Sequence, residues 1–266
     1  MRLEDISDYF KLRSLVANPW EVLRFRRGQR PGQTLTVQMQ GEPPLFLNGG
    51  QADYHMFHRI FLRDEYRLAG RDPGAWECVV DLGANVGLFS ACAARVARRV
   101  VALEPSPQLF GQLARNVEAR KEVEALQLAV AARPGSVRLY RPRGPGLTGA
   151  SSTHANRAEL VSEEYDEVAS TSLDALFRDH RIERCDLLKI DIEGMEYEAL
   201  GAASSDTLAR VQRIHGEYHE VAGDDPASTI EGLEALLRGQ GFEVERIPHR
   251  KKHQHGMFFA ARPGTS

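Results

Sequence analysis

Apolar residues recur with two different spacings in the larger, C-terminal part of the chain. Short apolar runs typical of buried strands alternate there with stretches in which apolar residues recur at helical spacing. The pattern predicts strands at 78–82, 100–103, 125–130, 136–140, 186–190 and 211–218, and helices at 88–97, 107–118, 173–179, from about 195 onwards, and at 229–238. Such alternation indicates a doubly wound, mostly parallel α/β sheet. Two final runs, 242–247 and 257–261, are close enough in sequence to pair as antiparallel strands.

The first part of the chain has a different pattern. Apolar positions at helical spacing run to about residue 27 and are interrupted at Asn18–Pro19, and a small hairpin follows at 34–39 and 45–47. Residues 53–68 then predict a helix with Asp53 as its N-cap. We therefore expect residues 1–70 to form an N-terminal extension or cap, and residues 71–266 to form the main domain.

Composition narrows the class of partner. The chain has 266 residues and a formal net charge of −3, which gives no electrostatic reason to expect nucleic acid as a partner. The basic cluster at 249–253 is short and indicates a solvated hairpin loop. No apolar stretch reaches the roughly 18 residues of a membrane span, and the N-terminus carries no apolar run of signal-peptide length. Neither a nucleic-acid nor a membrane partner is therefore expected, and the chain is compatible with a homo-oligomer.

The three cysteines indicate a compartment. Cys78, Cys92 and Cys185 show no CxxC spacing and lie in apolar surroundings, which is typical of small buried side chains rather than of a disulfide framework. A reduced, cytoplasmic location is therefore expected.

A glycine-rich segment follows the first predicted strand of the main domain. It has the form D-x-G-x-x-x-G, with Asp81, Gly83 and Gly87, and glycines after a buried strand let the backbone turn sharply against a ligand. The dinucleotide fingerprint G-x-G-x-x-G would require glycine where Asn85 stands, which argues against a nicotinamide cofactor. The alternative interpretation of this segment is a tight turn that binds no ligand.

Glu104 strengthens the ligand interpretation. It ends the next predicted strand, about 20 residues beyond the glycines, where an acid is placed to accept hydrogen bonds from both ribose hydroxyls of an adenosine. The alternative is an acid stabilised by the dipole of the following helix.

Carboxylates cluster after the predicted strand at 186–190. Ligands bind at the carboxyl ends of strands in open α/β sheets, so Asp191 should face the reactive end of the cofactor. Three carboxylates within six residues repel one another unless a cation, a proton or a basic neighbour compensates. We expect a function for Asp191 and Glu193, whereas Glu196 could equally be an acid of the first helical turn.

Glu217 and His219 end the following strand. They lie two residues apart and therefore on the same side of the strand, where they could orient an alcohol, remove its proton, or bind a divalent ion such as Mg²⁺ together with Asp191. The alternative is a polar, solvent-facing edge. The expected catalytic residues are Asp191 and His219, beside the hydroxyl of that alcohol, with Glu217 orienting His219. The expected metal ligands are Asp191 and Glu217.

Taken together, these segments resemble the FkbM family of methyltransferases. The matching elements are VVDLGANVGLFS (79–90), LEPSP (103–107), GASS (149–152), TSLDAL (171–176), LLKIDIEGMEYEAL (187–200) and GEYHE (216–220). The resemblance implies a Rossmann-like methyltransferase fold with an antiparallel last strand, and S-adenosylmethionine as the cofactor. It implies cofactor contacts at Asp81, Gly83, Asn85, Gly87 and Glu104, and near Asp191.

The resemblance also implies a reaction. It implies transfer of a methyl group to a hydroxyl of a sugar, a polyketide or another natural product, so a small-molecule acceptor is the expected partner. Two alternative functions remain compatible with the sequence: a nicotinamide-dependent oxidoreductase with the same fold, and a cofactor-binding protein without catalytic activity. The long Gly/Ser/Thr-rich segment at 144–155 is expected to close, with the N-terminal helices, over the acceptor.

Overall fold

The protein is built on a seven-stranded sheet. The computed structural model describes residues 3–28, 32–49, 51–142, 161–219, 229–249 and 252–265. The sheet has the strand order β11-β12-β10-β9-β3-β4-β5. Its strands are β3 (Trp76–Leu82), β4 (Ala97–Leu103), β5 (Val123–Leu126), β9 (Leu187–Ile190), β10 (Arg213–His219), β11 (Glu243–His249) and β12 (Lys252–Ala261). From β10 to β5 the neighbouring strands run parallel, and β12 is antiparallel to both of its neighbours. The predicted doubly wound, Rossmann-like methyltransferase sheet with an antiparallel last strand is confirmed.

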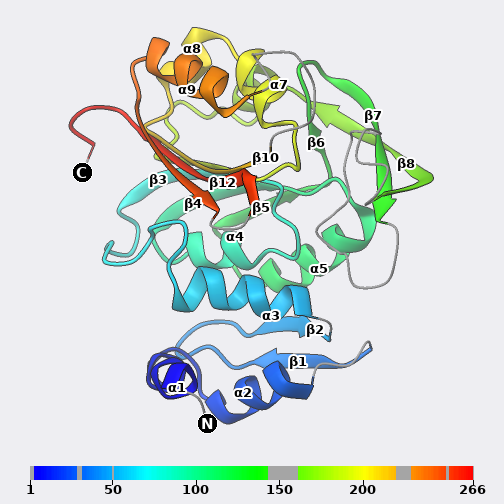
Figure 1. Ribbon diagram of the computed structural model, residues 1–266, viewed down its shortest axis with the longest axis vertical. Helices are drawn as coiled ribbons and strands as arrows, with labels where there is room; N and C mark the ends of the chain where they lie inside the picture. The colour runs from blue at the N-terminus through cyan, green and yellow to red at the C-terminus, as the bar shows by residue number, and fades with distance from the viewer. Residues whose placement is uncertain are drawn as a thin grey trace.

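Helices cover both faces of this sheet (Figure 1). Successive residues of a strand point to opposite faces, so Val79 packs with α4 (Leu88–Ala93) and α5 (Pro107–Val117), whereas Val80 packs on the other side. That second face carries α6 (Leu173–Asp179), α7 (Glu196–Gly201), α8 (Ser205–Ala209) and α9 (Ile230–Gly239). Both faces are therefore apolar, which is why the central strands read as continuous hydrophobic runs.

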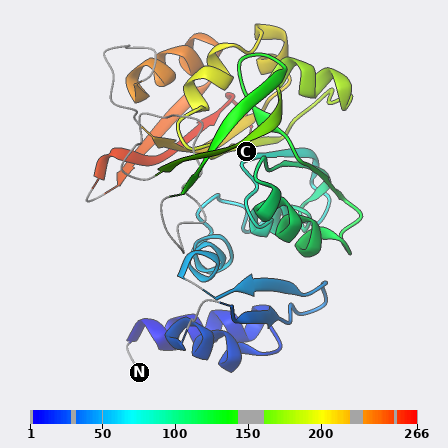
Figure 2. The same ribbon diagram turned by 90° about the vertical axis from the view of Figure 1, so that its right-hand side faces the viewer.

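The N-terminal extension forms a layer of its own beyond α4 and α5 (Figures 1 and 2). It consists of α1 (Leu3–Leu15), α2 (Pro19–Gly28), the hairpin β1 (Thr34–Val37) and β2 (Leu45–Asn48), and α3 (Gln51–Phe57). Its buried residues, among them Leu12, Val37 and Phe57, belong to the same apolar cluster as Leu88 of α4 and Val79 of β3. The extension and one face of the main sheet thus share a core.

The predicted helix at 53–68 is wrong at both ends. The α-helix begins at Gln51, and Asp53 lies inside it and accepts a hydrogen bond from the backbone N–H of Asn48 at 2.8 Å. After Phe57 the chain forms one π-helical turn, η1 (His58–Leu62), and then leaves the helix. The carboxylate of Asp64 accepts two backbone N–H bonds from the turn that follows, which is the local competition by which aspartate ends helices.

Two further element boundaries differ from the prediction. The helix predicted at 88–97 ends at Ala93, because residues from Ala97 onward pair with β3 instead. The strand predicted at 125–130 is two strands: β5 joins the main sheet, and β6 (Ala129–Val130) joins a separate sheet with the order β6-β8-β7.

That second sheet contains a strand that the sequence does not signal. The predicted strand at 136–140 is confirmed as part of β7 (Gly135–Pro142), and it pairs antiparallel with β8 (Val161–Thr171). The sequence of β8, VSEEYDEVAST, lacks apolar alternation, and the sheet buries only a small cluster, which contains Ala129, Leu139 and Val168. A strand with so little buried surface leaves no period-2 signal.

The structure also bears on the predictions about the cysteines and about membrane-spanning segments. All three cysteines are buried and free, as predicted. Over the residues described, we find no helix with the length and hydropathy needed to cross a bilayer. The segment at 144–155 lies outside the described residues, and so do parts of the basic cluster at 249–253.

Gly216 in the middle of β10 provides a test of the sheet packing. A Cβ there would lie 2.4 Å from the buried ring of Phe258 on β12 and 2.7 Å from Ile190 on β9, and both neighbours are fully buried. We expect Gly216→Ala to destabilise the protein by about 1–3 kcal/mol, the usual cost of overpacking. Gly239→Ala in α9 is the control, because its Cβ would meet nothing within 4 Å. Equal unfolding midpoints in urea for the two variants would contradict this packing.

Candidate active site

The carboxyl ends of the central strands open onto a pocket of about 250 Å³. Residues of β9, β10, the extension and the loop after β3 line it. This loop, residues 83–87, is called the glycine loop below. Six of the eight predicted site residues do so: Gly83, Asn85, Glu104, Asp191, Glu217 and His219. Asp81 and Gly87 do not line it.

The glycine loop turns through left-handed backbone. Gly83 has φ +76°, and a Cβ on it would lie 1.9 Å from the carbonyl oxygen of Asp191, so only glycine fits between β3 and the end of β9. Asn85, at φ 52°, also takes the left-handed conformation that asparagine tolerates. Gly87 (φ +83°) serves packing instead, because its Cβ would lie 2.6 Å from Leu113 of α5.

Asp81 supports the loop from below. Its side chain is fully buried, accepts a hydrogen bond from Ser90 Oγ at 2.6 Å, and lies 3.1 Å from Nζ of Lys189. Lys189 in turn donates to the carbonyl oxygen of Gly83 at 2.7 Å and lines the pocket. The predicted direct cofactor contact of Asp81 is therefore not supported, since its carboxylate is enclosed by protein.

Lys189 is a site residue that the sequence interpretation missed. Burial lowers its pKa, but the carboxylates of Asp81 and Asp191 more than offset this, so the pKa is raised and the ammonium stays charged. A lysine within the apolar run Leu187–Ile190 was the available signal, because a buried lysine needs a partner.

Glu104 lies in the pocket wall with its carboxylate held by backbone. Its two oxygens accept N–H bonds from Asn85 at 2.8 Å and from Ser106 at 2.9 Å. Burial raises its pKa to about 7, against the opposing effect of these two bonds. Each carboxylate oxygen retains a further acceptor position. Such an acid is suited to two neighbouring hydroxyl donors.

Glu217 of β10 lines the pocket and forms an ion pair with Arg59 of the extension. Its Oε2 lies 3.0 Å from Nη2 of Arg59, which comes from the π-helical turn and also binds Glu65 at 2.5 Å. Burial and the nearby charge of Asp191 raise the pKa of Glu217, while Arg59 and His219 lower it. Sequence interpretation missed Arg59, because nothing in the pattern links residues 158 positions apart.

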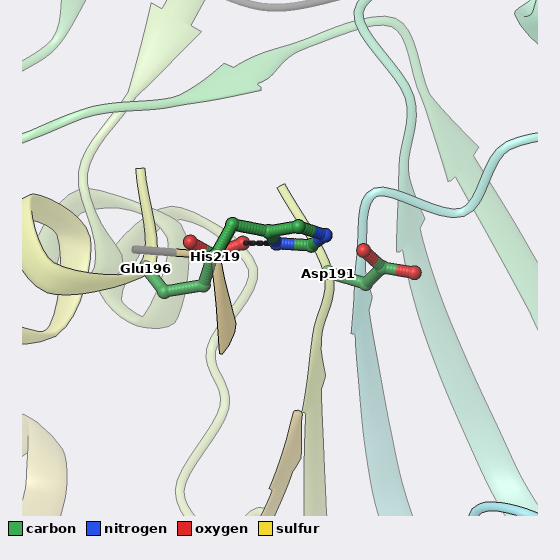
Figure 3. A group of neighbouring side chains, drawn as sticks. All are labelled: Asp191, Glu196 and His219. Carbon is green, nitrogen blue, oxygen red and sulfur yellow. Dashed lines mark hydrogen bonds and ion pairs between the residues drawn. The ribbon is translucent and has the colours of Figure 1, made fainter. Parts of the chain in front are cut away.

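His219 takes its hydrogen-bond partner from α7. Its Nδ1 lies 3.2 Å from Oε1 of Glu196, and its Nε2 lies 3.8 Å from Oε2 of Glu193. Figure 3 shows the imidazole between the carboxylates of Glu196 and Asp191. The prediction that Glu217 orients His219 is therefore wrong: Arg59 binds Glu217, and Glu196 orients the imidazole.

The charges around His219 change its titration. Burial lowers the pKa, but the hydrogen bond with Glu196 and the charges of Glu196, Glu193 and Asp191 outweigh it and raise the pKa to about 10.

The structure brings together a different set of candidate metal ligands from the predicted pair Asp191 and Glu217. Asp191, Glu196 and His219 each offer one ligand atom within 4.8 Å of the other two, whereas Glu217 is not part of this group. Glu196 already accepts backbone N–H bonds, from Ile192 at 3.0 Å and from Gly194 at 2.9 Å. The predicted Asp191–Glu217 metal pair gains no support, since Glu217 is neutralised by Arg59.

The strand order, the left-handed loop after β3 and the acid at the end of β4 define an S-adenosylmethionine-dependent methyltransferase. The model of the methyltransferase FkbM domain matches residues 81–244. The chain belongs to the FkbM methyltransferase family.

Relatives in the family share a little over a quarter of their residues with this chain. The methyltransferase sdnD of Sordaria araneosa is 29% identical, over 72% of this chain and 82% of its own. The 31-O-demethyl-FK506 methyltransferase FkbM of Streptomyces tacrolimicus is 28% identical, over 74% and 84%. The hexuronic acid methyltransferase AglP of Haloferax volcanii is 27% identical, over 69% and 73%. Among solved structures, fibrillarin of Aeropyrum pernix has a TM-score of 0.46 at 12% identity, covering 89% of this chain and 86% of that one.

The residues present fit S-adenosylmethionine. Glu104 offers carboxylate acceptors of the kind that ribose hydroxyls need, and the carboxylates of Asp191 and Glu193 in the same pocket suit a ligand that carries positive charge. Gly83 and Asn85 keep the loop backbone close to the pocket.

The raised pKa of Glu104 predicts that cofactor affinity depends on pH. Ribose hydroxyls donate to the ionised carboxylate, so binding of S-adenosylhomocysteine should weaken by up to about tenfold per unit as pH falls below 7. Glu104→Gln should bind about 10- to 100-fold more weakly at pH 8 and lose this dependence. Titration calorimetry between pH 5.5 and 8.5 measures both effects, with the exposed Glu118→Gln as control. A wild-type affinity that does not change over this range would exclude the role given to Glu104.

Proposed function

We propose that the protein is an O-methyltransferase that acts on a hydroxyl of a small acceptor such as a sugar, a polyketide or another natural product. The observation that carries this proposal is the pairing of two carboxylates, Asp191 and Glu217, in the pocket that Glu104 also lines. Carboxylates are acceptors for hydroxyl donors. The names of two relatives, the FK506 and hexuronic acid methyltransferases, are compatible with an oxygen-rich acceptor.

The sheet separates a cofactor side from an acceptor side. Glu104 ends β4 and Glu217 ends β10, and β3 and β9 lie between these strands. Glu104 would hold the ribose and Glu217 would contact the acceptor, and Asp191, which follows β9, lies between these two residues. This arrangement provides the alignment that transfer between two bound molecules requires.

The bound cofactor supplies a methyl group already activated by a sulfonium, so the protein must mainly align the acceptor and accept its proton. Asp191 and Glu217 are placed to hold the hydroxyl, and burial makes Glu217 a stronger base than an exposed glutamate. Arg59 binds Oε2 of Glu217, and Glu217 lines the pocket.

The extension forms the outer wall of the acceptor side. Met56, Arg59, Ile60 and Tyr66 line the pocket, and burial raises the pKa of Tyr66 well above its usual value, so its phenol stays neutral. We propose that these residues select the acceptor. Their contribution comes from 56–66, whereas apolar residues of α1 and the hairpin, such as Leu12 and Val37, support them through the shared core.

Rival functions are separated by simple measurements. The family match does not favour a nicotinamide-dependent oxidoreductase, and a protein without catalytic activity would bind S-adenosylmethionine without turning it over.

We expect a protein that acts in the cytoplasm on a small molecule, either as a monomer or as a homo-oligomer, and without nucleic acid or membrane partners. We also expect turnover to survive EDTA; loss of activity that Mg²⁺ or Mn²⁺ restores would instead assign an ion to Asp191.

Replacing Asp191 tests the acceptor site. A panel of hydroxylated sugars and polyketides, followed by mass detection of the methylated product and of S-adenosylhomocysteine, identifies an acceptor. With it, Asp191→Asn should lower kcat by about 10²–10⁴-fold, the scale of a positioned acid–base group, and leave S-adenosylmethionine affinity within a few-fold.

Asp206→Asn provides the matched control for that experiment, because Asp206 is exposed on α8 and does not line the pocket. Turnover at the wild-type rate in Asp191→Asn would remove Asp191 from the mechanism. Methylation of nitrogen or carbon alone across the panel would overturn the O-methyltransferase assignment.

A further inference from the structure

A second cavity, called the rear cavity below, shares Ile60 with the active-site pocket. Its volume is about 680 Å³, within the range of roughly 300–1,000 Å³ that is usual for small-molecule sites. Its lining includes Val96, which immediately precedes β4, and Glu122, which immediately precedes β5. The rear cavity therefore lies toward the amino ends of these strands, whereas the active-site pocket lies at the carboxyl ends of the sheet.

The wall of the rear cavity has an apolar part and a charged part. Ile60, Leu68, Ala91 and Val96 line it, and each is at most 7% exposed. These side chains offer a surface on which a short apolar body can pack. The charged residues of the lining are Arg71, Arg95, Arg120, Glu42, Asp64 and Glu122.

Arg120 is a buried cation of this lining, with only 6% of its surface exposed. Its Nη1 donates to the carbonyl oxygen of Asn116 at 2.6 Å, and its Nη2 donates to that of Pro43 at 2.7 Å. These two carbonyls use two of the five N–H donors of the guanidinium. Burial lowers the pKa of Arg120, against the attraction of Glu42 and Glu122, so the charge is only partly compensated.

Arg71 also lines the rear cavity. Its Nε is buried and has no hydrogen-bond acceptor in the part of the chain that the structure describes, and its guanidinium carbon lies 4.5 Å from the centroid of the Trp76 ring. Arg213 lies over the same ring at 5.8 Å, so positive charge gathers at this end of the cavity. A buried donor without an acceptor is costly, and a bound anion would supply the acceptor.

The carboxylates of the lining are engaged elsewhere or solvated. Oε1 of Glu42 lies 2.7 Å from Nε of Arg95, and Oδ1 of Asp64 accepts two backbone N–H bonds at 2.7 and 3.1 Å. Glu122 is exposed to solvent. The guanidinium groups described above have no ion-pair partner among the described residues, so the cavity retains capacity for negative charge.

We infer that the rear cavity is a second ligand site, which binds an organic anion with a short apolar body. The anionic group, a carboxylate or a phosphate, binds Arg71 and Arg120, because the planar N–H fork of arginine suits both. The apolar body packs against Ile60, Leu68 and Val96. This site goes beyond the proposed function, since it involves neither S-adenosylmethionine nor the methyl acceptor.

The rear cavity adjoins the acceptor side through the π-helical turn η1. Ile60 of this turn lines both cavities, and the preceding residue, Arg59, binds Glu217. Single π-helical turns are frequent at functional sites. A ligand in the rear cavity therefore contacts the same turn that forms part of the active-site wall.

Methyl NMR of the full chain, labelled on the δ1 carbons of isoleucine, tests the inference with octanoate and octyl phosphate as probes. Loss of one signal in Ile60→Val and of another in Ile192→Val identifies the two reporters. Ile60 lines both cavities, whereas Ile192 lines the active-site pocket and not the rear cavity. We expect at least one probe to shift Ile60 with a dissociation constant of about 1 mM or below, and to leave Ile192 in place.

Saturating S-adenosylhomocysteine should leave the affinity for the probe within about threefold, because the two sites are separate. A shift by octanoate, by octyl phosphate or by both supports the inference and identifies the preferred anion. Absence of a saturable Ile60 shift with either probe up to about 10 mM overturns it. Displacement of the probe by S-adenosylhomocysteine also overturns it, since the probe would then lie in the active-site pocket.

Arginine variants test the charge recognition. Arg71→Gln and Arg120→Gln should each weaken binding of the probe by about tenfold or more, the scale of a lost charge-assisted hydrogen bond. Arg98→Gln is the matched control, because Arg98 is exposed on β4 and lines neither cavity. Unchanged affinity in both cavity variants overturns the inference. If Arg120→Gln fails to fold, Arg71→Gln decides, since Arg71 is only half-buried.

Two further probes with the same apolar body test the sign of the charge. Octanamide is neutral and octylammonium is a cation, and each should bind at least about tenfold more weakly than the anion. Octanamide binding as tightly as octanoate would make the cavity an apolar site without charge recognition. Octylammonium binding as tightly would assign the cavity to its carboxylates, and either result overturns the inference.

Discussion

The buried ion pair between Asp81 and Lys189 is the constraint on which the rest of the site depends. It joins the central strands β3 and β9 below the glycine loop, and Lys189 also donates to carbonyl oxygens of the loop. Removing two charges from water is expensive, and removing one partner alone would leave an unpaired charge in the core. The pair therefore fixes where the loop leaves β3, and with it the positions of Gly83, Asn85 and Glu104.

Above this pair the pocket is rich in carboxylates and poor in free cations. Asp191, Glu193 and Glu217 line it, while Arg59 is bound by Glu217 and the imidazole of His219 is bound by Glu196. A site with this balance attracts a cationic ligand and disfavours an anionic one. Burial and the charge of Asp191 raise the pKa of Glu217, whereas burial lowers the pKa of His219 but is outweighed by the hydrogen bond with Glu196 and the neighbouring carboxylates, so that this pKa is also raised.

The sequence predicts the parts of the fold that depend on local pattern. The central strands are continuous apolar runs because both faces are covered, and the glycine loop and Glu104 are recognisable from their spacing along one segment. Element ends were less predictable: Asp64 terminates the helix of the extension through its side chain, and β8 buries too little surface to show alternation. Neither effect leaves a periodic signal.

The electrostatic partners in the site could not be read from the sequence. Arg59 reaches Glu217, and Glu196 rather than Glu217 reaches His219, because tertiary packing brings the extension and α7 over the end of β10. A strand predicts only which side chains share a face, so Glu217 and His219 were placed together correctly but given the wrong partners. The buried lysine in β9 is different, because a lysine within an apolar run signals by itself that a buried partner is needed.

The shared core of the extension and the main sheet has a consequence for engineering and for divergence within the family. The turn that carries Arg59 and Ile60 into the pocket is packed, through Phe57 and Ile60, into the same apolar cluster as α4 and β3. Exchanging this segment between relatives to obtain a different acceptor would also exchange one side of a hydrophobic interface. Chimeras should therefore tolerate such grafts only when the contacting positions of α4 are exchanged with them, so that acceptor choice and heat resistance are inherited together.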